Sequence, residues 1–126
     1  MSIDIAENLA KAKTLVEQGQ DAKARRLLQT ILAQEPDNQA ALLMLGGSYF
    51  CDGMLQEAEI VFERLVLSDP GRGEYSIALF NTLWKLNRTE EALEEMRRFL
   101  SAADRVKERK TVEQYMALVK TLERGE

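Results

Sequence analysis

A spacing of 34 residues recurs along this 126-residue chain and constrains its fold more than any other feature. Pro36 and Pro70 are separated by this interval. Four further pairs of positions keep the same interval: Gly19 and Gly53, Gly53 and Asn87, Ala24 and Ala58, and Ala58 and Ala92. Several coincidences in one register indicate an internal repeat. A repeat of this length is one supersecondary unit, which buries its apolar face by stacking on its neighbours.

Each repeat has the pattern of two helices. The chain has only two prolines, and apolar residues recur every three or four positions, as in Leu42, Leu45 and Tyr49. Gly19 and Gly53 stand where a helix needs a left-handed cap, and Asn87 is the usual substitute for glycine in that conformation. These signals predict an all-α chain with helices over residues 4–18, 21–34, 39–52, 55–68, 73–86, 89–102 and 106–124.

The middle repeat, residues 39–72, carries the clearest motif. It consists of Leu42, Leu45, Gly46, Tyr49, Gly53, Ala58, Phe62, Leu65 and Pro70. This pattern resembles the tetratricopeptide repeat, in which a Trp- or Leu-x-x-Leu-Gly-x-x-Tyr helix precedes an Ala-x-x-x-Phe helix and a closing proline. The outer repeats, 5–38 and 73–106, match less completely. Phe80 stands where the motif prefers a small residue, and Asp104 stands where it has proline.

The resemblance implies an α-solenoid, a right-handed superhelical stack of antiparallel helix hairpins with about seven helices in a single domain, residues 1–126. Residues 107–124 do not form a full repeat. One face of this segment is apolar, with Val112, Tyr115, Met116, Val119 and Leu122. We expect it to be a capping helix that covers the exposed edge of the last repeat.

Composition argues against several classes of function. The net charge is −4 with acids and bases interspersed, so we expect no nucleic-acid partner and interpret Lys107 and Lys110 as a solvated helix start. The chain lacks histidine and has one cysteine, Cys51. A general base near neutral pH and a multi-cysteine metal site are therefore missing. We expect no catalytic residue, metal or cofactor, and interpret the chain as a non-enzyme.

The sequence shows no targeting signal. The first residues lack the pattern of a signal peptide, and no apolar run approaches the length needed to span a membrane. We therefore expect a cytoplasmic protein without membrane insertion.

The resemblance also implies a binding surface, because the first helix of each repeat lines a concave groove in this family. The register assigns eight residues to that groove: Leu9, Lys13, Met44, Gly47, Phe50, Asn81, Trp84 and Lys85. Phe50 and Trp84 would give apolar contacts, and Gly47 would allow close approach of a partner backbone. The open alternative is that these side chains only pack against neighbouring helices. The carboxylate clamp that some members use on heat-shock chaperones is lost at four of its five positions, where this chain has Leu9, Met44, Glu74 and Ala78.

Two functional hypotheses follow. The leading one is a protein-interaction scaffold, adaptor- or chaperone-like, that holds a peptide or helix of a partner protein in an apolar groove. The alternative is a self-assembling protein that forms a homodimer through the terminal helix or the groove.

Overall fold

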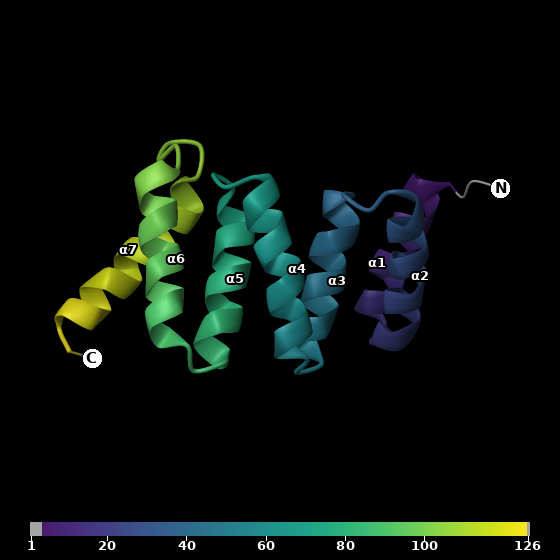
Figure 1. Ribbon diagram of the computed structural model, residues 1–126, viewed down its shortest axis with the longest axis horizontal. Coiled ribbons are helices and arrows are strands. Elements are labelled where there is room, and N and C mark those ends of the chain that lie inside the picture. The colour runs from purple at the N-terminus through teal and green to yellow at the C-terminus, as the bar shows by residue number, and fades with distance from the viewer. Residues whose placement is uncertain (1–3, 126) are drawn as a thin grey trace. The chain divides into compact units, whose positions relative to one another are not determined.

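The computed structural model describes residues 4–125, and within this range the chain forms seven α-helices and no strand (Figure 1). The helices are α1 (Ile5–Glu17), α2 (Asp21–Gln34), α3 (Gln39–Cys51), α4 (Leu55–Ser68), α5 (Gly73–Lys85), α6 (Thr89–Ala102) and α7 (Arg109–Glu123). The expected all-α helical-repeat fold is confirmed. The first six helices begin and end within one residue of their expected bounds.

The left-handed caps explain this agreement. Gly19, Gly53 and Asn87 have φ angles of 74°, 75° and 62°. A positive φ stops the preceding helix and turns the chain back into the next one, which is why glycine or asparagine recurs at this place in every hairpin. Asn38 caps the start of α3, since its side-chain oxygen accepts a hydrogen bond of 2.9 Å from the Ala41 amide.

The last helix differs from expectation. We expected it from residue 106, but α7 begins at Arg109. Residues 105–108 form a turn instead, in which the Asp104 carboxylate accepts hydrogen bonds from the amides of Val106 and Lys107 at 3.0 and 3.1 Å. These hydrogen bonds hold the pKa of Asp104 below its usual value, and the bond from the Lys107 amide has the largest effect.

The chain divides into two compact units, Met1–Leu65 and Val66–Glu126, with the boundary inside α4. In the first unit, α2 packs on both α1 and α3, and α1 also contacts α3. Gly46 of α3 faces Phe62 of α4 so closely that a Cβ there would lie 2.4 Å from the ring. The core of this unit is apolar and includes Ala12, Ala24, Leu28, Ile31, Ala41, Leu42, Leu45, Ala58, Phe62 and Leu65.

In the second unit, α5 packs on α6 and on α7. Tyr115 of α7 is buried, with its ring 5.3 Å from that of Phe80 and 5.7 Å from that of Phe99. This contact accounts for the unusual Phe80, because its ring fills space beside α7. The remaining core residues of the unit are Val66, Tyr75, Leu79, Leu83, Ala92, Met96 and Val112.

A buried polar network also ties α7 to this unit. The Glu95 carboxylate is bound by two nitrogens of Arg98, at 2.6 and 2.8 Å, and accepts a hydrogen bond of 2.7 Å from Ser76 Oγ. Since the single hydroxyl proton of Ser76 goes to Glu95, the Tyr115 hydroxyl must donate to Ser76 Oγ, at 2.8 Å. Burial raises the pKa of the Tyr115 phenol above its usual value, which keeps this donor protonated.

Among residues 4–125, none of the helices has both the length and the hydropathy required to cross a lipid bilayer.

Candidate partner-binding surface

Trp84 lies on α5 with an unusual combination of support and exposure. Its side chain is 39% exposed, although large aromatic residues usually lie in the interior. Its ring stacks on the buried Phe80, with centroids 5.5 Å apart and planes at 24°. Phe80 is in turn held edge-on by Tyr115. The exposed indole is therefore fixed by the core before any partner arrives, which lowers the entropy lost on binding.

The face of α5 that carries Trp84 is the least buried side of this helix. Glu74, Asn81 and Lys85 are exposed, and Ile77 is half-buried, at the spacing of one helical stripe. The opposite stripe holds core residues such as Leu79 and Leu83. The second unit therefore brings together the three groove residues that the sequence assigned to it, Asn81, Trp84 and Lys85, on one accessible face.

A cavity of about 440 Å³ extends this face toward α7. The N-terminal half of α5 forms one wall and the start of α7 forms the other. Its lining residues are Glu74, Ile77, Lys107, Glu108, Lys110, Thr111 and Gln114. A hollow of this size can accept one or two side chains of a partner.

The charges of this cavity are arranged unevenly. Glu74 forms an ion pair with Arg72 at 3.5 Å, and the Glu108 carboxylate accepts a hydrogen bond from the Gly73 amide. Lys107 and Lys110 form no ion pair within residues 4–125. The two acidic groups are thus engaged inside the protein, whereas the Lys110 ammonium group forms no ion pair with a described residue and that of Lys107 interacts with Asp104 at longer range.

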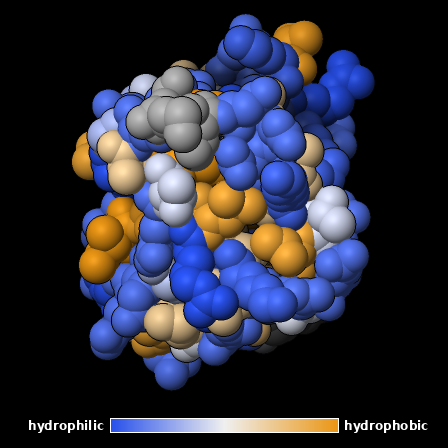
Figure 2. Space-filling model, turned by 90° about the vertical axis from the view of Figure 1, so that its right-hand side faces the viewer, coloured by the Kyte–Doolittle hydropathy of each residue, from blue (hydrophilic) through white to orange (hydrophobic). Residues whose placement is uncertain are grey.

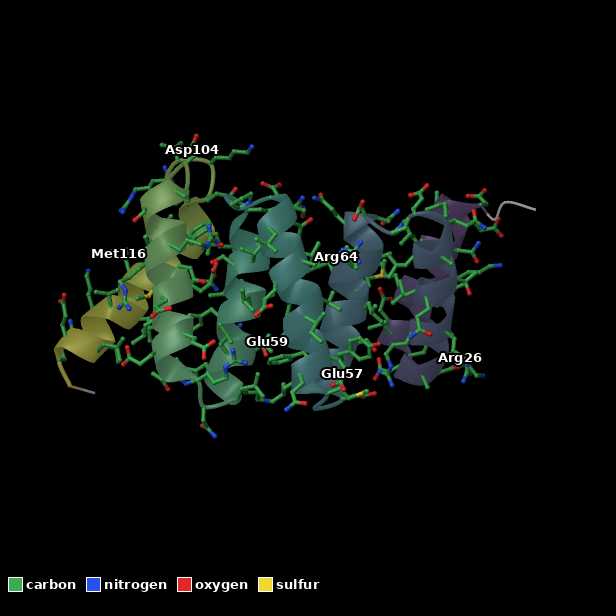
Figure 3. The ribbon with its side chains drawn as sticks, viewed as in Figure 1. Arg26, Glu57, Glu59, Arg64, Asp104 and Met116 are labelled. Atoms are coloured by element: carbon green, nitrogen blue, oxygen red, sulfur yellow. The ribbon has the colours of Figure 1, made fainter. Side chains whose placement is uncertain are left out.

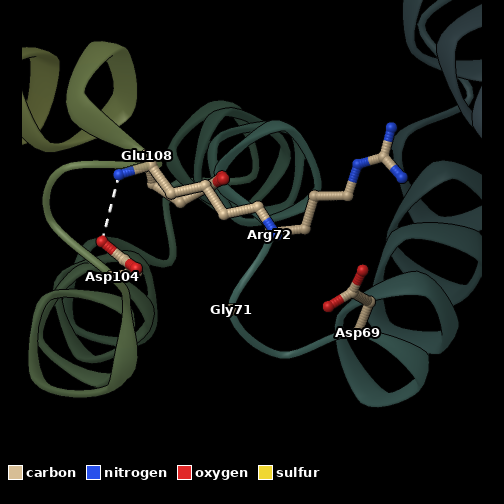
Figure 4. Close-up of a pocket in the computed structure, with 6 residues that line it drawn as sticks. Asp69, Gly71, Arg72, Asp104 and Glu108 are labelled. Atoms are coloured by element: carbon tan, nitrogen blue, oxygen red, sulfur yellow. Dashed lines mark hydrogen bonds between the residues drawn. The ribbon is translucent and has the colours of Figure 1, made fainter.

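A second, smaller cavity of about 310 Å³ lies between the turn before α5 and the turn before α7 (Figure 4). It is lined by Asp69, Gly71, Arg72, Asp104, Lys107 and Glu108. The Glu108 amide donates to the Asp104 carbonyl oxygen at 2.9 Å, and the Arg72 guanidinium lies 4.7 Å from the ring centroid of Tyr75. Most of the polar groups here hold the two turns in place, so the arrangement is structural.

The first unit carries the other five groove residues. Leu9 on α1 and Met44, Gly47 and Phe50 on α3 are half-buried, and Lys13 on α1 is exposed. A Cβ at Gly47 would meet no atom of the described residues within 4 Å. Packing inside the unit therefore does not require a glycine at this position, in contrast to the neighbouring Gly46.

The first unit also has an apolar hollow at its α1–α2 end. Figure 2 looks onto this end and shows apolar atoms in a depression ringed by hydrophilic side chains. A cavity of about 460 Å³ lies here, lined by Glu7, Ala10, Lys11, Thr14, Leu15 and Leu27.

Sequence reasoning missed the contribution of α7 to the surface beside α5. Lys107 and Lys110 were interpreted as a solvated helix start, because no repeat motif places that segment next to α5. The signal that could have found them is the pair Gly73 and Thr111. A Cβ on Gly73 would lie 2.2 Å from Thr111 Oγ1, so this glycine is required by the approach of α7.

The helical repeats resemble those of known proteins. Residues 15–78, which are 64 of the 126 residues, match the family model of the tetratricopeptide repeat. The chain belongs to the tetratricopeptide repeat family. Proteins of this family are generally non-catalytic scaffolds for protein–protein interaction. The search among curated proteins gives no match.

Solved structures share the fold. A crystal structure of MamA protein superposes with a TM-score of 0.71 at 20% identity, over 77% of this chain and 53% of that one. A MamA AMB-1 structure gives 0.71 at 23% identity, over 79% and 54% of the two chains. A tetratricopeptide repeat protein from Parabacteroides merdae ATCC 43184 gives 0.71 at 25% identity, over 76% and 39%. The chain thus spans about half the length, or less, of these structures.

Proposed function

We propose that this chain is an adaptor- or chaperone-like scaffold that holds a peptide or helix of another protein against the accessible faces of its first helices. Trp84 carries this proposal. A tryptophan that is 39% exposed yet stacked on a buried ring has the properties of an interface anchor, since it offers a large apolar area at little entropic cost.

The surroundings of Trp84 suit a peptide. Asn81 and Lys85 on the same face of α5 can orient polar groups of a partner backbone or side chain. The cavity between α5 and α7 would receive an adjacent side chain of the partner, next to the ammonium groups of Lys107 and Lys110. In the first unit, the open space at Gly47 would let a partner backbone approach α3 beside Phe50.

The test is quantitative affinity capture from the native cell with the wild-type chain and three variants. Trp84→Ala and Phe50→Ala remove the two aromatic anchors. Ile60→Ala is the matched control, because Ile60 is 68% exposed on α4, a second helix, outside the proposed surface.

We expect Trp84→Ala to reduce the recovery of a specific partner at least about tenfold, which corresponds to the 1.4 kcal/mol or more of an anchoring residue. Ile60→Ala should leave recovery unchanged, and circular dichroism should show native helicity in every variant that is scored. Equal recovery with Trp84→Ala and with wild type would refute the assignment of Trp84 as the anchor.

A further inference from the structure

The outer face of α7 is only partly covered. Val112 and Tyr115 are buried against the second unit, but Met116 and Leu122 are 38% and 41% exposed. In Figure 1 the C-terminal turns of α7 diverge from α6, and Figure 3 shows Met116 on the side away from α5. A cavity of about 390 Å³ opens between the two helices, lined by Leu93, Met96, Arg97, Val119, Leu122 and Glu123.

The order of residues in α7 matches that of a first helix of a repeat. Val112, Tyr115, Met116 and Val119 have the same spacing as Leu42, Leu45, Gly46 and Tyr49 in α3. In α3 the third of these positions, Gly46, is covered by Phe62 of the second helix of the hairpin. The equivalent Met116 is 38% exposed. The face of α7 around Met116 is therefore the place for an antiparallel second helix.

The charges around Met116 specify which helix fits. One stripe of α7 consists of residues spaced alternately by four and three positions. They are Arg109, Glu113, Met116, Lys120 and Glu123. All five are exposed, and the four charged ones form no ion pair in the part of the chain that the structure describes. The stripe is basic then acidic before the methionine, and basic then acidic after it.

This order is self-complementary for two antiparallel copies. If Met116 of one copy faces Met116 of another, Arg109 lies opposite Glu123 of the second copy. Glu113 then lies beside Lys120 of the second copy. A two-fold axis through Met116 makes each of these pairs twice, as an isologous contact requires. The same axis gives the antiparallel direction that the two helices of a repeat hairpin have.

We propose that α7 is a homodimerisation helix, on which a second copy of this chain supplies its own α7 as the missing second helix. The contact is centred on Met116 and is bordered by the cavity between α6 and α7. It is separate from the surface around Trp84, so the dimer can form whether or not that surface binds a partner. The ion pairs at the rim select the second copy, and the apolar area around Met116 stabilises the contact.

Charge reversal tests this pairing directly. In a Glu113→Lys dimer and in a Lys120→Glu dimer, like charges meet at two symmetric places. Each single variant should therefore weaken the dimer at least about tenfold, as measured by sedimentation equilibrium over a wide concentration range. An equimolar mixture of the two variants restores both opposite-charge pairs, so it should form a heterodimer about as tight as the wild-type dimer at low salt.

The controls use charges outside α7. Glu57→Lys and Arg26→Glu reverse exposed charges on α4 and α2 in the first unit, and both should dimerise like wild type (Figure 3). Circular dichroism confirms that each variant is folded. Met116→Lys should abolish the dimer without loss of helicity, which supports the apolar centre independently of the rim charges.

Several results would overturn the proposal. One is a wild-type chain that stays monomeric up to millimolar concentration. Another is a dimer that survives both single reversals. A third is an assembly that responds to Leu27→Lys in the α1–α2 hollow but not to Met116→Lys, which would place the contact at the other end of the chain.

Discussion

Two adjacent glycines in α3 should respond to alanine with opposite signs. A Cβ at Gly46 would lie 2.4 Å from Phe62 Cε1 and 2.9 Å from Cδ1 and Cζ, and the Phe62 side chain is only 3% exposed. Such overpacking costs roughly 2–3 kcal/mol, offset by about 1 kcal/mol because alanine favours the helix over glycine. Gly46→Ala should therefore lower the free energy of unfolding by about 1–2 kcal/mol.

Gly47 is the matched control on the same helix. A Cβ there would meet no described atom within 4 Å, so only the helix preference remains. Gly47→Ala should raise the free energy of unfolding by about 0.5–1 kcal/mol.

Urea unfolding, followed by circular dichroism at 222 nm, measures both changes through the midpoint of the transition. A second-site variant, Gly46→Ala with Phe62→Leu, should recover part of the loss because the smaller side chain can move away from the new Cβ. If Gly46→Ala stabilised the protein as much as Gly47→Ala, the close packing of α3 on α4 would be wrong.

The remaining predictions concern α7. Removing the phenol hydroxyl in Tyr115→Phe should destabilise the protein by about 0.5–1.5 kcal/mol at neutral pH, as judged by the urea midpoint, because Ser76 Oγ loses a buried donor. Burial raises the folded-state pKa of Tyr115. The contribution of this phenol to stability is therefore fully present below the ordinary phenol pKa of about 10 and is lost as the pH rises above it. Above about pH 10 the urea midpoint of wild type should fall more steeply than that of Tyr115→Phe. Gly73→Ala should loosen the start of α7, because the new Cβ would lie 2.2 Å from Thr111 Oγ1, and hydrogen exchange of the α7 amides should quicken while that of α1–α3 stays unchanged. Unaltered exchange in α7 would contradict that packing.

Most of the fold could be predicted from the sequence because each hairpin has its own residue that ends the first helix. Gly19, Gly53 and Asn87 fix the helix ends through their backbone conformation, and this local property does not depend on the rest of the chain. The start of α7 was mispredicted because the turn before it rests on Asp104, whose hydrogen bonds to backbone amides have no distinctive sequence pattern.

The candidate site was less accessible to sequence reasoning. The exposure of Trp84 and the placement of Asn81 and Lys85 follow from the register of α5. The support of Trp84 by Phe80 depends on Tyr115, which follows Phe80 by 35 residues and comes from a helix after the three repeats. The direction of that helix decides which of its residues line the cavity beside α5, and Lys107 and Lys110 were missed for this reason.

The intrinsic fluorescence of Trp84 tests the central claim most directly, since it is the only tryptophan of the chain. Titration with the partner segment recovered by affinity capture should shift the emission to shorter wavelength and saturate at the stoichiometry measured by calorimetry, because binding would bury an indole that is now 39% exposed. A partner that binds by calorimetry but leaves the emission of Trp84 unchanged would contradict the account.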